Sequence, residues 1–193
     1  MGDLPDHRRK YRLRLRRHPA ESPNLLLCAE LLRLRVGLTR NTAVPRLDLA
    51  AAQDMPAIRA PLERAGLPTK DLASAQADFA VMREEDAVVA TGALQRFGAS
   101  ALLRSVAVAP DRRGGGLGRM IVSELERRAR AAQVSELVLL TETASDFFQR
   151  LGYRVVDRDS APAGVQTSED FRSLCPSSAT CMAKTLTLDP DGA

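Results

Sequence analysis

The chain has 193 residues, 45% of them hydrophobic, and a formal net charge of +4, which fits a soluble globular protein with a core of its own. No apolar run approaches the roughly 18 residues of a membrane span, and three cysteines, an odd number, fit a reducing cytoplasm better than a disulfide framework. Both histidines, His7 and His18, stand close to the start of the chain. The rest of the sequence therefore excludes His-based acyl transfer, catalytic triads and histidine metal sites.

Residues 1–45 hold the excess of positive charge, with ten Lys or Arg against four Asp or Glu. A leucine-rich stretch there is interrupted by Glu30 and lacks the small-residue cleavage site of a secretory signal. A nucleic-acid arm is the functional alternative, but Tyr11 is the only aromatic residue available to stack on bases. We predict a mobile extension over residues 1–45, a domain over 46–188 and a tail over 189–193.

The first half of the domain predicts a strand, a helix and a hairpin. Alternating leucines indicate a strand at 47–49, and the segment 55–66 has proline in its first turn, a helical apolar face and a terminal glycine. Two strands, 79–83 and 87–95, flank the acidic turn 84–86. We interpret this turn as a solvated hairpin tip rather than a metal or base site.

The middle of the domain predicts a phosphate-binding loop. An apolar run, Leu102–Val108, is stopped by Pro110 and followed by the glycine-rich sequence RRGGGLG. Apolar residues then recur at helical spacing, namely Leu117, Ile121, Leu125, Ala129 and Ala132. A strand that leads through glycines into a helix is typical of anion binding, because glycine lets the backbone approach the ligand and the helix start offers free N–H groups.

Two common phosphate motifs do not fit this loop. The Rossmann fingerprint needs a glycine three positions after Gly116, where Arg119 stands. The P-loop needs lysine and then serine or threonine after Gly118, but Arg119 and Met120 stand there. A nicotinamide or flavin dinucleotide, ATP and GTP are therefore excluded as ligands of this loop.

The second half of the domain predicts shorter elements. An apolar strand is expected at 137–141, then a helix with Thr143 as its N-cap, and a strand beginning at 153–156. A short helix at 168–174 and a last strand at 181–188 complete the pattern. The order of strands and helices predicts an α/β domain with a mixed sheet.

The pattern Arg113-x-x-Gly116-x-Gly118, directly after the V-x-V-x-P strand end at 106–110, resembles the pyrophosphate-binding motif of the GCN5-related N-acetyltransferases (GNAT). The resemblance implies the acyl-CoA N-acyltransferase fold over residues 46–188, with a mixed, mainly antiparallel sheet and helices on both faces. It also implies acetyl-CoA as co-substrate and no metal.

Two finer resemblances concern the branch of the superfamily. Residues 139–144, with 147–148 and 151–153, look like the amino-acid acetyltransferases that include N-acetylglutamate synthases. Residues 161–182 look more specifically like the arsenic-resistance N-acetyltransferases. They imply transfer of an acetyl group to the amine of a small amino-acid-like compound, with a link to arsenic resistance. From the composition we expect a cytoplasmic protein without a nucleic-acid or membrane partner, and a homodimer is one option. The alternative is a degenerate, non-catalytic protein that binds coenzyme A or arsenite.

The resemblance also implies a site. In the superfamily the strand before the loop separates from its neighbour, so that its backbone binds pantetheine and the thioester oxygen, here with Val106 as the oxyanion-binding group. The implied cofactor-binding residues are Val106, Ala107, Val108, Arg113, Gly114, Gly115, Gly116, Leu117, Gly118 and Phe148. Phe148 stands where many relatives have the tyrosine that protonates the leaving thiolate, which leaves that role to water or makes the protein a weak catalyst.

On the acceptor side the sequence offers fewer signals. Glu142, at a strand end, is a weak candidate for the base, and a helix-capping role explains it equally well. Arg104, inside an apolar strand, is either a fork for a substrate carboxylate or a salt-bridged structural residue. Thr141 is the other expected substrate contact. Cys175 and Cys181 are expected to be packing residues, not catalytic ones.

Overall fold

A computed structural model describes residues 45–188, so the expectations for the N-terminal extension and the C-terminal tail fall almost wholly on residues outside this part. Seven strands of the described residues form one sheet in the order β1-β2-β3-β4-β5-β7-β6. Their bounds are β1 Arg46–Leu49, β2 Ala77–Glu84, β3 Ala87–Phe97, β4 Ser100–Val108, β5 Glu136–Thr141, β6 Arg154–Val155 and β7 Thr180–Thr185.

The helices connect and cover these strands. The α-helices are α2 Met55–Arg64, α3 Leu117–Ala131, α4 Ser145–Gln149 and α5 Ala163–Gln166. Four shorter turns are η1 Ala52–Asp54, η2 Pro110–Arg112 and η3 Arg158–Ser160, which are 3₁₀, and η4 Asp170–Leu174, which is a π-turn.

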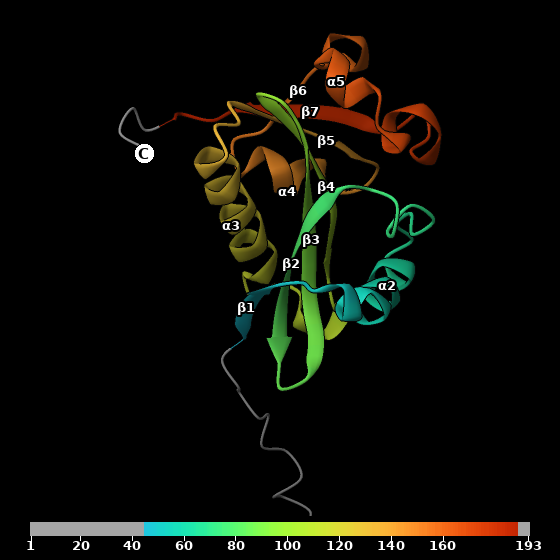
Figure 1. Cartoon of the computed structure of the whole chain (residues 1–193), viewed down its shortest axis with the longest axis vertical. Coiled ribbons are helices and arrows are strands. Elements are labelled where there is room, and N and C mark those ends of the chain that lie inside the picture. The colour runs from blue at the N-terminus through green and yellow to red at the C-terminus, as the bar shows by residue number, and fades with distance from the viewer. Residues whose placement is uncertain (1–44, 189–193) are drawn as a thin grey trace, which may run out of the picture. The chain divides into compact units, whose positions relative to one another are not determined.

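Neighbouring strands pair antiparallel throughout the sheet except β4 and β5, which run parallel. Helices cover both faces, with α3 on one side of the sheet and α2 on the other (Figure 1). The alternation along β2 shows why: Ala80 and Met82 pack in the core with α3, and Phe79 and Val81 pack with α2. The predicted mixed, mainly antiparallel sheet between helices is confirmed.

The structure corrects two local predictions. Helix α4 has Ala144, not Thr143, as its N-cap residue, and the Ala144 N–H donates to the hydroxyl oxygen of Thr141 at 3.0 Å. The strand expected from Tyr153 is shorter, because the Tyr153 N–H donates to the carbonyl of Phe148 at 3.1 Å and so closes the α4 turn. Both differences arise from hydrogen bonds at the two ends of α4. One joins the start of the helix to the end of β5, and the other joins its last turn to the segment that follows.

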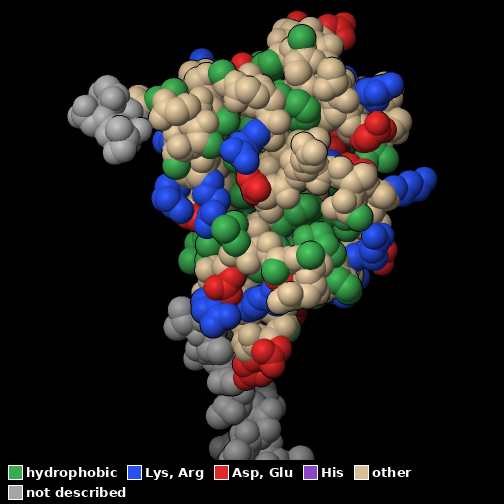
Figure 2. Space-filling model, in the orientation of Figure 1, with side chains coloured by type: hydrophobic (Ala, Val, Ile, Leu, Met, Phe, Trp, Pro, Cys, Tyr) green, Lys and Arg blue, Asp and Glu red, His purple; other side chains and the backbone are tan. Residues whose placement is uncertain are grey.

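Charged and hydrophobic side chains both reach the surface of the described residues. In Figure 2 the charged side chains of both signs lie mostly near the margins of the view. Hydrophobic side chains gather between them. Among the described residues, the large hydrophobic side chains that are exposed belong to three different elements. They are Leu49 on β1, Met120 on α3 and Val155 on β6. Isolated residues of this kind need no partner to explain them.

Candidate active site

A β-bulge in β4 shapes the centre of the site. Thr91 of β3 pairs with Ala107, and Ala93 pairs with Arg104, so β4 has one residue more than β3 between these pairs. Ser105 in the bulge has a φ of +55°, in the left-handed region. Such an extra residue bends the strand that carries it and ends regular pairing nearby.

Beyond this point β4 and β5 separate. Their parallel pairing runs from Ser100 with Glu136 to Leu102 with Val138 and stops there, although β4 continues to Val108 and β5 to Thr141. The stretch 106–108 therefore has β3 on one side and no paired β5 residue on the other. This is the separation that the resemblance implied for the strand before the glycine loop.

The glycine loop turns directly into helix α3. Gly114 has a φ of +80° and Gly116, the N-cap of α3, has a φ of +83°, and a Cβ on either would meet nothing within 4 Å. A Cβ on Gly118 would lie 3.3 Å from the Phe147 ring, so the first turn of α3 packs closely on α4. Arg113 donates from Nε to the carbonyl oxygen of Val108 at 3.2 Å, which ties the loop to the end of β4. The loop thus leaves open space above the free N–H groups of a helix start.

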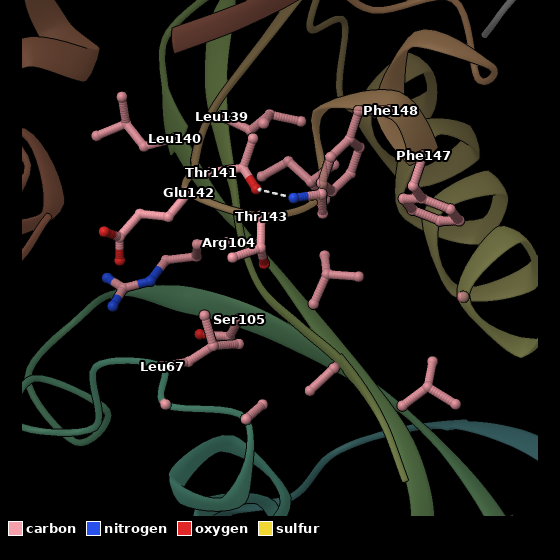
Figure 3. A pocket seen from close by; sticks show the side chains of 18 of the residues that line it. Leu67, Arg104, Ser105, Leu139, Leu140, Thr141, Glu142, Thr143, Phe147 and Phe148 are labelled. Atoms are coloured by element: carbon pink, nitrogen blue, oxygen red, sulfur yellow. Dashed lines mark hydrogen bonds between the residues drawn. The ribbon is translucent and has the colours of Figure 1, made fainter. Parts of the chain in front are cut away.

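A pocket of about 690 Å³ lies between the separated strands, within the usual size of small-molecule sites. Its walls are the ends of β4 and β5, the glycine loop, α4, the segment after α2 and the segment after η4. Figure 3 shows its two ends: the side chains of Phe147 and Phe148 lie on one side, and those of Arg104 and Glu142 on the other. Because Phe147 packs on Gly118, the phenylalanine side is the glycine-loop end.

Four arginines line the glycine-loop end, and the sequence analysis singled out only one of them. They are Arg112, Arg113, Arg119 and Arg150. Arg112 also donates to the Glu84 carboxylate at 2.6 Å, and this hydrogen bond raises the pKa of Arg112. The turn at 84–86, expected to be a solvated hairpin tip, therefore holds the start of the loop through one of its carboxylates.

Phe148 is buried and lines the pocket, as expected for the residue in the tyrosine position. Its ring packs edge-on against Phe147 at 5.0 Å and against Tyr153 at 5.5 Å between centroids. Tyr153 is buried in the core behind Phe148, away from the residues that line the pocket, and burial raises its pKa. Neither ring can therefore deliver a proton to a thiolate in the pocket.

Arg104 is buried, and both of its Nη atoms contact carboxylates. Asp71, in the segment after α2, accepts from Nη1 at 2.6 Å and from Nη2 at 2.7 Å. Asp170, at the start of η4, places Oδ2 2.8 Å from Nη1. Burial acts to lower the pKa of Arg104, but its hydrogen bond to Asp71 and the charges of both carboxylates leave the pKa raised. Of the two alternatives for Arg104, this geometry is that of a salt-bridged structural residue. Its two Nη atoms are occupied and cannot together bind a substrate carboxylate.

The remaining predicted residues divide between the pocket lining and the core. Thr141, Glu142 and Cys175 all line it, and Glu142 is exposed. Burial raises the pKa of the Cys175 thiol to about 11, so this thiol stays protonated at neutral pH. Cys181 lies buried on β7, and burial raises its pKa as well. Thiols that hold their protons are poor nucleophiles, which agrees with a packing role.

The described residues contain no group of three or more His, Cys, Asp or Glu side chains placed to hold a metal ion. Within the same range no helix is both long and apolar enough to cross a membrane.

Part of the chain is similar in sequence to known acetyltransferases. Residues 75–155 match the model of the acetyltransferase (GNAT) domain. An amino-acid acetyltransferase of Mannheimia succiniciproducens is 27% identical over 125 residues, which cover 60% of this chain and 28% of that protein. This chain therefore spans little more than a quarter of the length of that curated relative.

Two solved structures share the fold. N-acetylglutamate synthase from Neisseria gonorrhoeae, complexed with coenzyme A and N-acetyl-glutamate, has a TM-score of 0.65 at 22% identity, over 76% of this chain and 36% of that chain. A Mycobacterium tuberculosis protein in complex with CoA has a TM-score of 0.60 at 26% identity, over 74% of this chain and 100% of that chain. The described residues therefore have the GNAT fold, and the segment 75–155 is similar in sequence to the acetyltransferase domain of that superfamily.

Proposed function

We propose that this protein is an acetyl-CoA-dependent N-acetyltransferase that acts on the primary amine of a small, amino-acid-like compound. The observation that carries the proposal is the pocket itself, which joins a glycine-loop helix start to the gap between β4 and β5. One end is built for an anion and the other opens beside the unpaired edge of β4. A long molecule with a diphosphate at one end and a reactive group at the other fits this arrangement.

The cofactor is expected to lie along the pocket from loop to strand. The N–H groups of the loop 113–118 bind the diphosphate, where glycines at 114 and 116 leave space for close approach. Arg119 and Arg150, which line this end, add positive charge. The pantetheine then pairs with the backbone of 106–108, and its thioester oxygen meets the N–H of Val106, which acts as the oxyanion-binding group.

The reaction proposed is direct attack of the amine on the thioester, without an acyl-enzyme intermediate. The nitrogen lone pair forms the new C–N bond, the C–S bond breaks, and one of the two protons that leave the nitrogen ends on the coenzyme A sulfur. Phe148 cannot give that proton to the thiolate, so water delivers it. Because coenzyme A is a good leaving group as a thiolate, this step tolerates the missing tyrosine at some cost in rate.

The acceptor class rests on the named relatives and on a polar group that lines the pocket at the end of β5. The Thr141 hydroxyl oxygen already accepts from the Ala144 N–H, so its own proton is free to donate to a substrate carboxylate. The carboxylate fork expected at Arg104 is not part of this proposal, because Asp71 and Asp170 hold the guanidinium.

We add three finer proposals that do not rest on the geometry of the site. A link to arsenic resistance rests on the resemblance of residues 161–182, and growth on arsenite with and without the protein tests it. A cytoplasmic location and a homodimer are tested by fractionation and by light scattering. None of them bears on the acetyl-transfer experiment.

The test is trapping of released coenzyme A with a thiol reagent, across L-glutamate, L-glutamine, L-arginine, glycine and their decarboxylated amines, with coenzyme A affinity measured by calorimetry. We expect tight binding and amine-dependent release. Binding without release for any amine would favour the alternative, a coenzyme A-binding regulatory protein in which Phe148 marks the loss of catalysis.

A further inference from the structure

A second, small cavity adjoins the Arg104 end of the pocket. Its volume is about 40 Å³, and Arg104, Ser105 and Cys175 line both spaces. Asp170 also lines the small cavity but not the main pocket. The cavity therefore lies between a buried carboxylate and the place where an acceptor amine would enter.

Two buried polar atoms beside this cavity have no hydrogen bond within the described residues. They are Nε of Arg104 and Oδ2 of Asp170. Oδ2 lies 2.8 Å from Nη1 of Arg104, but the angles are not those of a hydrogen bond. A water needs only about 10–15 Å³ of accessible space and two to four polar partners, and this cavity offers the space, one donor and one acceptor.

The groups that face Asp170 leave its charge incompletely balanced. Asp71 uses both of its oxygens on Arg104, so two carboxylates share one guanidinium. The Cys175 sulfur lies 3.8 Å from Oδ1 of Asp170, and Arg158 donates to the Asp170 backbone carbonyl instead of the side chain. Burial raises the pKa of Asp170, the Asp71 charge adds to this and Arg104 opposes it. A proton is thus held more readily there than on an ordinary aspartate.

We propose that Asp170 accepts the proton of the acceptor ammonium through a water held in this cavity between its carboxylate and Nε of Arg104. The water gives one proton to Asp170 and takes one from the ammonium, which leaves the nitrogen lone pair free to attack the thioester carbonyl. Asp170 returns its proton to solvent after transfer. Cys175 cannot replace it, because a protonated thiol has no site for a second proton. Asp170 acts through the water, so it is a positioning residue, and the inference rests on the proposed function.

The test is the pH dependence of kcat/KM for the best amine found in the panel above. If Asp170 takes the proton, the wild type binds the ammonium form, and kcat/KM is flat between the pKa of Asp170 and that of the free amine. In Asp170→Asn only the neutral amine reacts, so kcat/KM rises about tenfold per pH unit up to the pKa of the amine. We expect a loss of about 100-fold at pH 7, typical of a missing proton acceptor, that shrinks as the pH approaches that pKa.

Two matched variants separate this role from a structural one. Asp71→Asn removes the other carboxylate on Arg104 but leaves Asp170 at the cavity, so it should lower the melting temperature and retain the flat region. Glu142→Gln tests the competing base. If Glu142→Gln removes the flat region and Asp170→Asn does not, Glu142 is the proton acceptor and the inference is wrong.

If Asp170→Asn does not fold, the pH profiles of the wild type and of Glu142→Gln decide the case. A wild-type profile that rises with unit slope to the pKa of the amine overturns the inference while leaving the acetyltransferase function intact. A flat region for alkylamines that is retained in Glu142→Gln supports it. Absence of turnover with every amine would overturn the proposed function and this inference together.

Discussion

Replacing Gly116 by glutamate tests the cofactor site most directly. Gly116 has a φ of +83°, and a Cβ there would meet nothing within 4 Å, so the new side chain enters the open space above the loop without displacing protein atoms. The left-handed backbone costs a non-glycine residue about 1–2 kcal/mol, which lowers the melting temperature of a domain of this size by about 2–8 °C. Repulsion between the carboxylate and one phosphate charge about 4 Å away adds about 4 kcal/mol near a protein surface, roughly a thousandfold in Kd.

Calorimetry with coenzyme A measures the affinity, and thermal unfolding shows whether the fold is kept. Gly116→Ala is the control for backbone strain, since it has the same φ without charge or length. Gly98→Glu is the control for placing a glutamate at a left-handed glycine, because Gly98 has a φ of +66°, an equally open Cβ position and a place in the β3–β4 turn outside the pocket lining. We expect Gly116→Glu alone to lose binding while unfolding stays cooperative. An unchanged affinity would refute the assignment of the loop to the diphosphate.

Three further changes test the roles assigned elsewhere. Deleting residues 1–44 should leave turnover within about twofold, as for a dispensable terminus, and a collapse of activity or solubility would contradict this. The double variant Cys175→Ser, Cys181→Ser should retain coenzyme A release, because both pKa values are raised and neither thiol is needed as a nucleophile. Arg104→Ala leaves two buried carboxylates without their partner, so it should cost about 3–5 kcal/mol of unfolding free energy and slow all amines alike. A loss confined to amines that bear a carboxylate would restore Arg104 as a substrate contact.

Most of the fold could be predicted because its elements carry local signals. The helix from Met55 and the strand–loop–helix unit around Gly116 follow from apolar periodicity and glycine positions, and the structure confirms them. The N-cap of α4 could not be predicted, since Thr143 and Thr141 have the same hydroxyl chemistry and only the strand end decides which one reaches the Ala144 N–H. Apolar periodicity and glycine positions predict that a helix or strand exists. Its first and last residues depend on contacts with neighbouring elements.

The site likewise has one part that the sequence predicts and another that only the folded chain reveals. The loop residues follow each other along the chain, so their sequence alone indicated an anion-binding turn. Arg150 and Arg119 point to no function by themselves, because surface arginines are common, and only the folded chain brings them to the pocket. Asp71 and Asp170 come from segments far from Arg104 in the sequence and from each other, so no motif could have revealed their shared guanidinium.

The bulge at Ser105 explains why Arg104 does not share a face of β4 with Val106. In a regular strand, residues two apart share a face, so Arg104 would lie on the same face as Val106. The extra residue reverses the alternation: Leu103 before the bulge and Val106 after it both pack toward α3, although three positions separate them. Arg104 directly follows Leu103 in the strand, so its side chain lies on the opposite face of the sheet. Ala107 packs with α2 on that face. The same bulge that opens β4 for a cofactor therefore turns Arg104 away from the cofactor edge and toward Asp71 and Asp170.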